Sequence, residues 1–202
     1  MGRSIGELIF ILTGLVTGIL AALWSAGMLG GGRGLAMDDV SVRGWMSDWA
    51  IGSSQAGLVT RARVARHGLL AMSRSEAIYF TRATDDAGDP LMEDCDYRLT
   101  GGDQPAEWWS LTLYDPDSRL PMNTDGALSL DRSRTGGADA WLATISARAP
   151  AHDGFWISSR GSGEFDLTLR LYRPSDSVLS DPETYLSTPS IQRLTCRNGA
   201  GR

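Results

Sequence analysis

The pattern of apolar positions begins with one long uncharged run near the N-terminal end of the chain. From Leu8 to Gly32 the sequence holds only apolar and small residues with a few hydroxyl groups. As an α-helix this run would be about 37 Å long, which is enough to cross a bilayer. The pattern therefore predicts a transmembrane helix over about 8–32, within an N-terminal membrane anchor of residues 1–33.

A cleaved signal peptide is the alternative interpretation of this run. The run is longer than the apolar part of a usual signal peptide, and its best small-residue cleavage site, around Ser25 to Gly27, lies inside it. These features favour an uncleaved anchor that contacts the lipid bilayer. Gly14 and Gly18 have the spacing that lets two membrane helices approach closely, which predicts a weak homodimer, although glycine is also common in membrane helices for other reasons.

Helical spacing predominates in the next part of the chain, a helical linker region over 34–74. Val42, Trp45, Met46 and Trp49 recur at the spacing of one helical face, and this face is expected to pack against the domain core or to rest at the headgroup layer.

A second helix is predicted over 55–72, with Ser53 or Ser54 as its N-cap. The apolar stripe expected on it consists of Leu58, Ala62, Ala65, Leu69 and Met72. Arg61, Arg63, Arg66 and His67 lie off that stripe. They are interpreted as a solvated basic face, with contact to anionic lipid as the alternative.

After Ser73 the period changes to that of β-strands. Short runs rich in aromatic, branched and threonine residues are separated by turns rich in Gly, Pro, Asn and Asp. The predicted strands are 77–81, 97–99, 108–114, 141–146, 155–158, 165–172 and 191–195. In 165–172 the apolar Phe165, Leu167, Leu169 and Leu171 alternate with polar residues, as in a half-buried antiparallel strand. The pattern predicts a mainly β fold, an antiparallel β-sandwich or jelly-roll-like domain over 75–202, preceded by one or two helices and the transmembrane helix.

Three of these runs resemble a known family. Glu76 to Phe80 (EAIYF), Trp108 to Asp115 (WWSLTLYD) and Leu167 to Pro174 (LTLRLYRP) are similar to the domain of unknown function 1214 family, and the likeness covers about 75–194. In many members this domain follows a larger companion domain, whereas this chain resembles the short, membrane-anchored form. The resemblance implies a β-sandwich in the cell envelope, and it carries no established reaction or catalytic residue.

The charged residues of the chain limit the kinds of molecule that it is expected to bind. The chain has 19 basic and 24 acidic groups, and every basic residue is Arg. This balance argues against nucleic-acid binding, because a phosphate backbone requires a dense basic surface. The absence of lysine excludes Schiff-base chemistry and a P-loop lysine, while an Arg-lined face remains suited to a carboxylate or phosphate.

The two cysteines, Cys95 and Cys196, indicate the cellular compartment of the globular domain. An even pair outside any CxxC pattern is expected to form a structural disulfide in an exported domain, and across so long a loop it would contribute roughly 4 to 5 kcal/mol. Two buried thiols in a cytosolic domain are the alternative. The disulfide predicts a single-pass protein of the bacterial inner membrane whose globular domain lies in the periplasm.

The sequence shows little catalytic chemistry. With only two histidines, His67 and His152, and both cysteines expected in a disulfide, no metal site and no cofactor are predicted. His152, Asp153 and a serine offer a Ser-His-Asp combination that any serine-rich chain contains, and no nucleophile-elbow pattern accompanies it. Glu76, Asp115, Asp117, Glu164 and Asp166 are carboxylates that two strands or turns could bring together, although capping and turn roles are the common explanation.

The most promising surface is the polar side of two strands. Trp108, Tyr114, Arg170 and Tyr172, joined by Arg82, are the predicted ligand-binding residues, because aromatic platforms beside guanidinium groups hold a sugar, a lipid headgroup or an acidic metabolite. The competing interpretation is a second core layer beneath the helices, with Arg170 paired to an acid. The preferred function is a non-enzymatic envelope protein that binds a small ligand or another envelope protein, and the alternative is a carboxylate-based periplasmic hydrolase acting on a glycan or ester.

Overall fold

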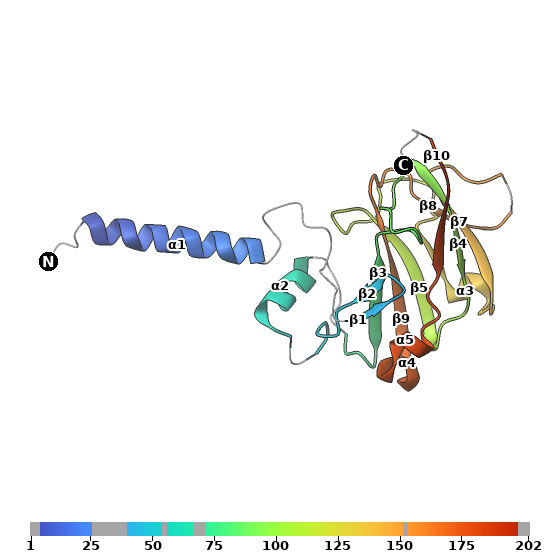
Figure 1. Cartoon of the computed structure of the whole chain (residues 1–202), viewed down its shortest axis with the longest axis horizontal. Helices are drawn as coiled ribbons and strands as arrows, with labels where there is room; N and C mark the ends of the chain where they lie inside the picture. The colour runs from blue at the N-terminus through green and yellow to red at the C-terminus, as the bar shows by residue number, and fades with distance from the viewer. Residues whose placement is uncertain (1–4, 26–39, 54–55, 67–71, 152, 198–202) are drawn as a thin grey trace.

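The apolar N-terminal run forms a helix that projects away from the β-rich body of the protein (Figure 1). The computed structural model describes residues 5–25, 40–53, 56–66, 72–151 and 153–197. Within the first of these ranges α1 spans Ile5–Ser25, starting earlier than the predicted Leu8, and residues 26–32 of the predicted span lie outside the described residues. The segment Gly6–Trp24 has a mean hydropathy of 2.1 and is long and apolar enough to cross a membrane, as an anchor or a signal sequence would be. An added Cβ at Gly14 or Gly18 would meet no atom within 4 Å, and dimerisation through them stays a prediction.

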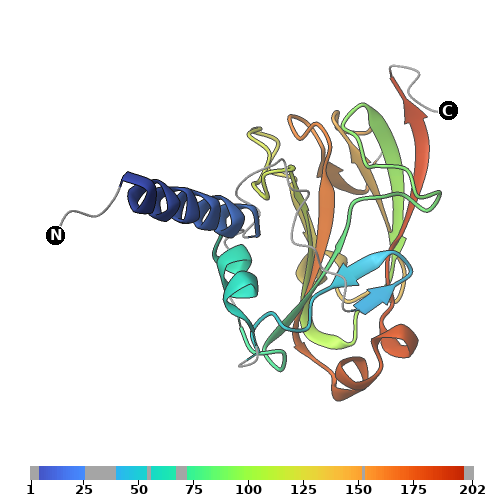
Figure 2. The same cartoon turned by 60° about the vertical axis from the view of Figure 1, so that its left-hand side comes forward.

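The body consists of two packed sheets, as the alternation predicts (Figures 1 and 2). The larger sheet has the order β1-β2-β3-β9-β5-β6 and the smaller β10-β4-β7-β8. The strands of the larger sheet are Val40–Val42 (β1), Trp45–Ser47 (β2), Ala77–Arg82 (β3), Ala106–Tyr114 (β5), Ser129–Asp131 (β6) and Asp166–Pro174 (β9). Those of the smaller are Cys95–Gly101 (β4), Trp141–Ser146 (β7), Phe155–Ser158 (β8) and Ser190–Cys196 (β10). Every strand predicted after Ser73 is confirmed, and the pairing is antiparallel except between β7 and β8.

Alternate residues of both sheets fill the space between them. Leu167, Leu169 and Leu171 are fully buried, and each such side chain contributes roughly 1.5 to 3 kcal/mol relative to exposure. Trp109 of β5 stacks on Trp141 of β7 with ring centroids 5.6 Å apart, which joins the two sheets. At Gly101 an added Cβ would lie 2.4 Å from the Trp141 ring, so this position requires glycine.

The prediction of a helical face at Val42, Trp45, Met46 and Trp49 is wrong. Val42, Trp45 and Met46 belong to a β-hairpin of β1 and β2 whose two turn residues, Arg43 and Gly44, have φ of 50° and 84°, and Trp49 lies in a turn after β2. Positive φ at both central positions matches the type I′ turn, whose twist suits a tight hairpin. Met46 pairs with Thr81, so the larger sheet starts before the predicted domain boundary at 75.

The second predicted helix is shorter and faces the other way. Helix α2 spans Leu58–Arg66; Gln55 and residues 67–71 lie outside the described residues, and Met72 is not helical. Among its described side chains Val64 is buried, and it packs with Ile51 and Met46. The predicted inward stripe is therefore wrong as far as it is described, because Leu58, Ala62 and Ala65 are exposed.

Short helices and the disulfide close the sandwich. Helix α3 (Arg132–Thr135) follows β6, and helices α4 (Asp176–Ser180) and α5 (Pro182–Tyr185) lead from β9 to β10. Cys95 and Cys196 are register partners on neighbouring strands and form the predicted disulfide. The C-terminal strand is thus held by a covalent bond as well as by its sheet hydrogen bonds.

Candidate functional site

The outer face of the larger sheet, which points away from the smaller sheet, carries four of the five predicted ligand-binding side chains: Trp108, Tyr114, Arg170 and Tyr172. Strand register places Trp108 opposite Tyr172, Ser110 opposite Arg170 and Tyr114 opposite Asp166. On the other side of β9, Tyr79 pairs with Arg170 and Thr81 with Thr168. Because alternate residues of a strand share a face, these partners form one continuous surface over β3, β9 and β5.

Arg170 lies at the centre of this surface between two tyrosines. Its guanidinium is 5.1 Å from the ring centroid of Tyr114 and 5.8 Å from that of Tyr79, and its Nη2 donates a hydrogen bond of 2.7 Å to the Tyr114 hydroxyl. Among the described residues no carboxylate lies within 4.0 Å of it. We name Tyr79, Tyr114 and Arg170 the outer-face cluster. The competing interpretation was a second core layer in which Arg170 is paired to an acid. Such a pair is not found within the described part of the chain, whereas Tyr79, Ser110 and Thr168 of this face are buried.

An aromatic pair continues the surface toward one end of the sheet. The rings of Trp108 and Tyr172 are 5.4 Å apart and inclined by 54°, and 37% of Trp108 is exposed. The Trp108 indole nitrogen donates to Ser133 Oγ at 3.0 Å, which fixes the ring orientation. Beside it lies an open hollow of about 280 Å³, lined by Trp108, Arg132, Ser133, Gly136 and Gly137.

Asp166 lies at the opposite end of the same surface. Burial raises the pKa of its carboxyl to about 7, and the nearby charge of Asp115 acts in the same direction. The Thr168 hydroxyl, 3.5 Å from Asp166 Oδ1, and the charge of Arg170 act against this shift. A carboxyl that titrates near neutrality can hold or release a proton under physiological conditions, which is the property of a general acid or base.

The predicted membership of Arg82 in this face is wrong. Arg82 pairs with Leu167, whose side chain is in the core, so it points to the other side of β3. It is 7% exposed, donates to the Asp85 carbonyl and forms a 3.0 Å ion pair with Asp86. A strand position with the wrong parity cannot join the outer face, whatever its side-chain chemistry.

Arg82 instead belongs to a cluster in which every charge has a partner. Asp85, which is 2% exposed, forms an ion pair of 2.8 Å with Arg193 of β10 and accepts hydrogen bonds from the backbone of Ala87 and Asp89. Arg193 also donates to the Pro90 carbonyl at 2.8 Å. We name Arg82, Asp85 and Arg193 the paired cluster; it fastens the loop after β3 to the C-terminal strand.

The other predicted carboxylates are dispersed. Glu76 is exposed at the far end of β3, and hydrogen bonds from the side chain and backbone of Ser73 lower the pKa of its carboxyl. Asp115 accepts from the backbone of Asp117 and Arg119 as a turn residue does. Among the predicted acids, Asp115 contributes through its charge to the raised pKa of Asp166.

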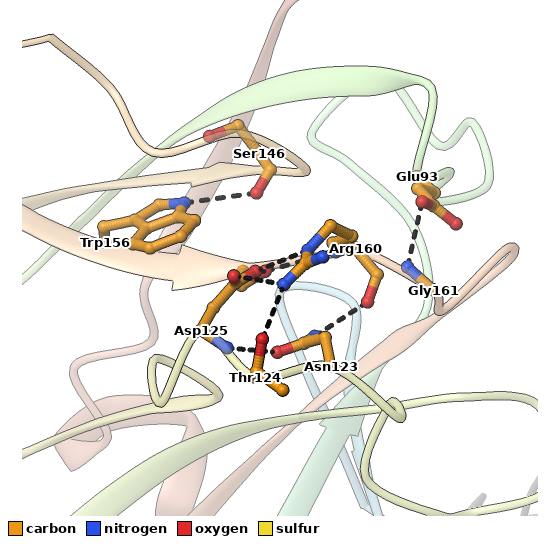
Figure 3. A network of polar contacts seen from close by, with 9 residues as sticks. Glu93, Asn123, Thr124, Asp125, Ser146, Trp156, Arg160 and Gly161 are labelled. Atoms are coloured by element: carbon orange, nitrogen blue, oxygen red, sulfur yellow. Dashed lines mark hydrogen bonds and ion pairs between the residues drawn. The ribbon is translucent and has the colours of Figure 1, made fainter.

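A further polar network lies at one end of the sandwich and was not predicted (Figure 3). Asp125 forms an ion pair with Arg160 and accepts a 2.6 Å hydrogen bond from Ser158, and both contacts lower the pKa of the Asp125 carboxyl. The Asn123 side chain donates to the Arg160 carbonyl at 2.7 Å. Asn123, Asp125 and Arg160 lie in loops whose sequence carries no periodicity, so the pattern of polar positions offered no signal for the network.

This network holds loops rather than presenting a free group. The Glu93 carboxylate accepts backbone hydrogen bonds from Gly161 at 2.9 Å and Gly163 at 3.0 Å. Asp125 takes two donors of Arg160, so that guanidinium is paired, unlike Arg170. His152, the imidazole of the predicted Ser-His-Asp combination, lies outside the described residues. No group of three or more His, Cys, Asp or Glu suited to a metal is found in the described part of the chain.

The fold defines a class: a two-sheet β-sandwich preceded by a helix apolar enough to cross a membrane. Residues 76–176 match the family described as Protein of unknown function (DUF1214), and the chain belongs to that family. Comparison with curated proteins gives no match.

Among solved structures the chain is similar to the VPA0106 protein from Vibrio parahaemolyticus, with a TM-score of 0.55 and 18% identity. The likeness covers 96% of this chain and 47% of that one, so this chain spans about half the length of its structural relative. An uncharacterized protein from Burkholderia cenocepacia is similar at a TM-score of 0.36 and 17% identity over 62% of this chain and 31% of that one. These likenesses concern the fold alone.

Proposed function

We propose that this protein is anchored in the bacterial inner membrane by α1 and binds a small anionic ligand, or an anionic group of another envelope component, on the outer face of its larger sheet. The observation that carries the proposal is the environment of Arg170. Its guanidinium is held in place by two tyrosine rings and one neutral hydroxyl. A carboxylate or phosphate of the ligand would supply the direct ion pair that is absent among the described residues.

The chemistry of the surface suits such a ligand. A guanidinium presents its donors in a rigid fork that matches a carboxylate or a phosphate, and such charge-assisted hydrogen bonds are roughly twice as strong as neutral ones. Tyr114 and Tyr79 restrict the motion of Arg170 before a ligand arrives, which lowers the entropic cost of binding. Trp108 and Tyr172 lie two residues from the pair of Ser110 and Arg170 on β5 and β9. They offer an aromatic platform for an apolar or sugar part of the same ligand.

Two features support a periplasmic location. Helix α1 has the length and hydropathy of an anchor. The disulfide between Cys95 and Cys196 is a bond that persists in oxidising compartments and is rare in the cytosol. Both are explained if the chain crosses the inner membrane once and its sandwich lies in the periplasm.

Native mass spectrometry of the full-length protein, extracted gently from its own membrane, tests the proposal. We expect a co-purifying adduct on the wild type that is lost in Arg170→Gln. The matched control is Arg98→Gln, because Arg98 is an exposed arginine of β4 in the other sheet and is expected to leave the adduct unchanged. An adduct that persists in Arg170→Gln, or the absence of any adduct on the wild type, would contradict binding at this site.

A carboxylate-based hydrolase acting on a glycan or ester is the second candidate, and Asp166 is the observation that favours it. With a pKa near 7 and Asp115 close by, Asp166 has the protonation behaviour of a general acid. The test is turnover of a panel of nitrophenyl esters and glycosides by the full-length protein. Turnover by the wild type that Asp166→Asn abolishes would support this candidate, and turnover equal in the two proteins, or absent from both, would reject it.

A further inference from the structure

Helix α2 is attached to the domain by one side and exposes apolar residues on another. Val64 is 6% exposed and packs with Ile51, which holds the helix to the hairpin side of the larger sheet. Leu58, in contrast, is 85% exposed, and Ala62 and Ala65 are exposed as well. An apolar stripe at helical spacing that is turned away from the core calls for a partner outside the domain.

A mostly apolar hollow accompanies this stripe. It has a volume of about 390 Å³ and is lined by Ile51, Gly52, Ser53, Ala56, Arg61, Val64 and Ala65. Arg61, the charged residue of this lining, is exposed, and its Nε donates to the Ala56 carbonyl at 3.0 Å. The surface therefore combines apolar area with a cation at its edge.

The place of α2 in the molecule indicates which partner meets this surface. Figures 1 and 2 both show α2 on the side of the body from which α1 extends. The end of α1 is marked by the exposed Trp24, a residue type enriched where membrane helices meet the headgroup layer. In a chain anchored by α1, the surface of α2 is thus kept close to the bilayer.

We propose that α2 is a second membrane contact: it lies in the headgroup layer of the membrane that α1 spans, with Leu58 directed toward the acyl chains and Arg61 at the phosphate of an anionic phospholipid. This proposal rests on the membrane anchoring proposed above. Arginine can place its alkyl chain along apolar surface while its guanidinium stays among phosphates. The helix is too short and too polar to bind a bilayer strongly by itself, but an anchor already supplies a high local concentration, so a modest second contact is enough to orient the domain.

The cysteine content of the chain allows a direct test. Its two cysteines are joined in the disulfide, so a single introduced cysteine can carry a polarity-sensitive nitrobenzoxadiazole dye. Leu58→Cys probes α2, and Leu142→Cys is the matched control, because Leu142 is also an exposed leucine (53%) but lies in β7 of the smaller sheet. Both full-length proteins are reconstituted in vesicles of phosphatidylethanolamine and phosphatidylglycerol.

We expect the dye at position 58 to show a blue shift and to lose emission when nitroxide-labelled lipid is present, while the dye at position 142 shows neither effect. Arg61→Gln should reduce the quenching at position 58, as should replacement of phosphatidylglycerol by phosphatidylcholine. These results would place α2 in the headgroup layer and assign the anionic lipid to Arg61.

Two other outcomes would overturn the proposal in distinguishable ways. If the protein resists carbonate extraction but the dye at position 58 behaves like that at 142, the membrane contact of α2 fails and the anchor stands. If carbonate releases the protein, the proposed anchoring fails and the contact fails with it. Neither outcome bears on ligand binding at Arg170, which the adduct measurement tests separately.

Discussion

Two groups of arginines in this protein differ in what surrounds them. In the paired cluster, Arg82 and Arg193 contact the carboxylates of Asp86 and Asp85 and several carbonyls, and both arginines are largely buried. In the outer-face cluster, Arg170 contacts two tyrosines. Arg170 and Arg193 both lie on strands that the sequence predicted. Both also lie beside an aromatic ring, because the Arg193 guanidinium is 5.8 Å from the centroid of the Tyr97 ring.

The difference shows how the role of an arginine follows from its partners. A buried guanidinium with carboxylate partners has its charge compensated, and removing a partner damages the fold. A guanidinium held by neutral groups keeps its charge available to an incoming anion, and removing it should cost little stability. The comparison therefore predicts a separation between variants that unfold the protein and variants that only stop binding.

The largest expected effect is the loss of stability on removing Asp85. Asp85→Ala leaves Arg193 without its shortest ion pair in a mostly buried site, which should cost about 3 kcal/mol. Urea denaturation of the full-length protein in a mild detergent measures this. Asp89→Ala is the control, because the Asp89 side chain is 63% exposed, its ion pair with Arg193 is longer at 3.5 Å, and Arg193 keeps its partner Asp85, so the loss should be less than about 1 kcal/mol. A loss of less than about 1 kcal/mol in Asp85→Ala would show that the paired cluster does not hold the fold.

Asp166→Asn should stabilise the protein in a pH-dependent way. The pKa of Asp166 is raised from an ordinary 3.8 to about 7 in the folded chain. Between about pH 4 and 7 the folded chain thus keeps a proton that the unfolded chain has lost, and wild-type stability falls as the pH rises through that window. The variant lacks this loss, so its advantage should grow from pH 4 to 7 and reach on the order of 2 to 4 kcal/mol at pH 8.

Denaturation of both proteins at several pH values measures this advantage, with Asp153→Asn on an exposed loop as the control. An advantage for Asp166→Asn that is the same at pH 4 and pH 8 would mean that Asp166 titrates in the ordinary range. In that case the hydrolase candidate would lose its supporting observation.

Arg170→Gln should have a small effect on stability and a large one on binding. The variant loses one hydrogen bond to a neutral hydroxyl and two cation–π contacts, which together amount to about 2 kcal/mol, less than the loss expected for Asp85→Ala. The same denaturation experiment measures the stability, and the adduct experiment measures the binding. A stability loss as large as that of Asp85→Ala would place Arg170 among the structural arginines and remove the contrast between the clusters.

The smallest expected effect is that of Tyr114→Phe. This variant keeps the ring beside Arg170 and removes the hydroxyl that accepts its hydrogen bond. We expect a stability change of less than about 1 kcal/mol and an adduct that is retained, because the guanidinium still carries its charge. Loss of the adduct in Tyr114→Phe would assign the hydroxyl itself to the ligand site.

Most strands of the fold could be predicted from the sequence because their pattern is local. Phe165, Leu167, Leu169 and Leu171 alternate with polar residues, and all four are buried in the structure. The hairpin of β1 and β2 was mistaken for a helix because its strands are too short for a period to show. There the spacing of Val42, Trp45 and Met46 fits a helix as well as a tight turn flanked by short strands.

The candidate site was predicted in part for the same reason. Trp108, Tyr114, Arg170 and Tyr172 were predicted to share a face because the parity of their strands is readable, and the register brings them together. Arg82 was included without regard to parity, and its side chain lies on the core side. Tyr79 was missed although its position in β3 has the parity of the outer face.

The sequence by itself determined the apolar N-terminal segment, the order of the main strands and which of their residues face the core, because each depends on neighbouring residues along the chain. Only the tertiary structure decided which arginines have carboxylate partners and that the stripe of α2 is turned outward. Asp85 and Arg193 are far apart in the chain, and Val64 rather than Leu58 meets the sheet side. Contacts between distant segments depend on how the sheets pair and pack, and no local period records them.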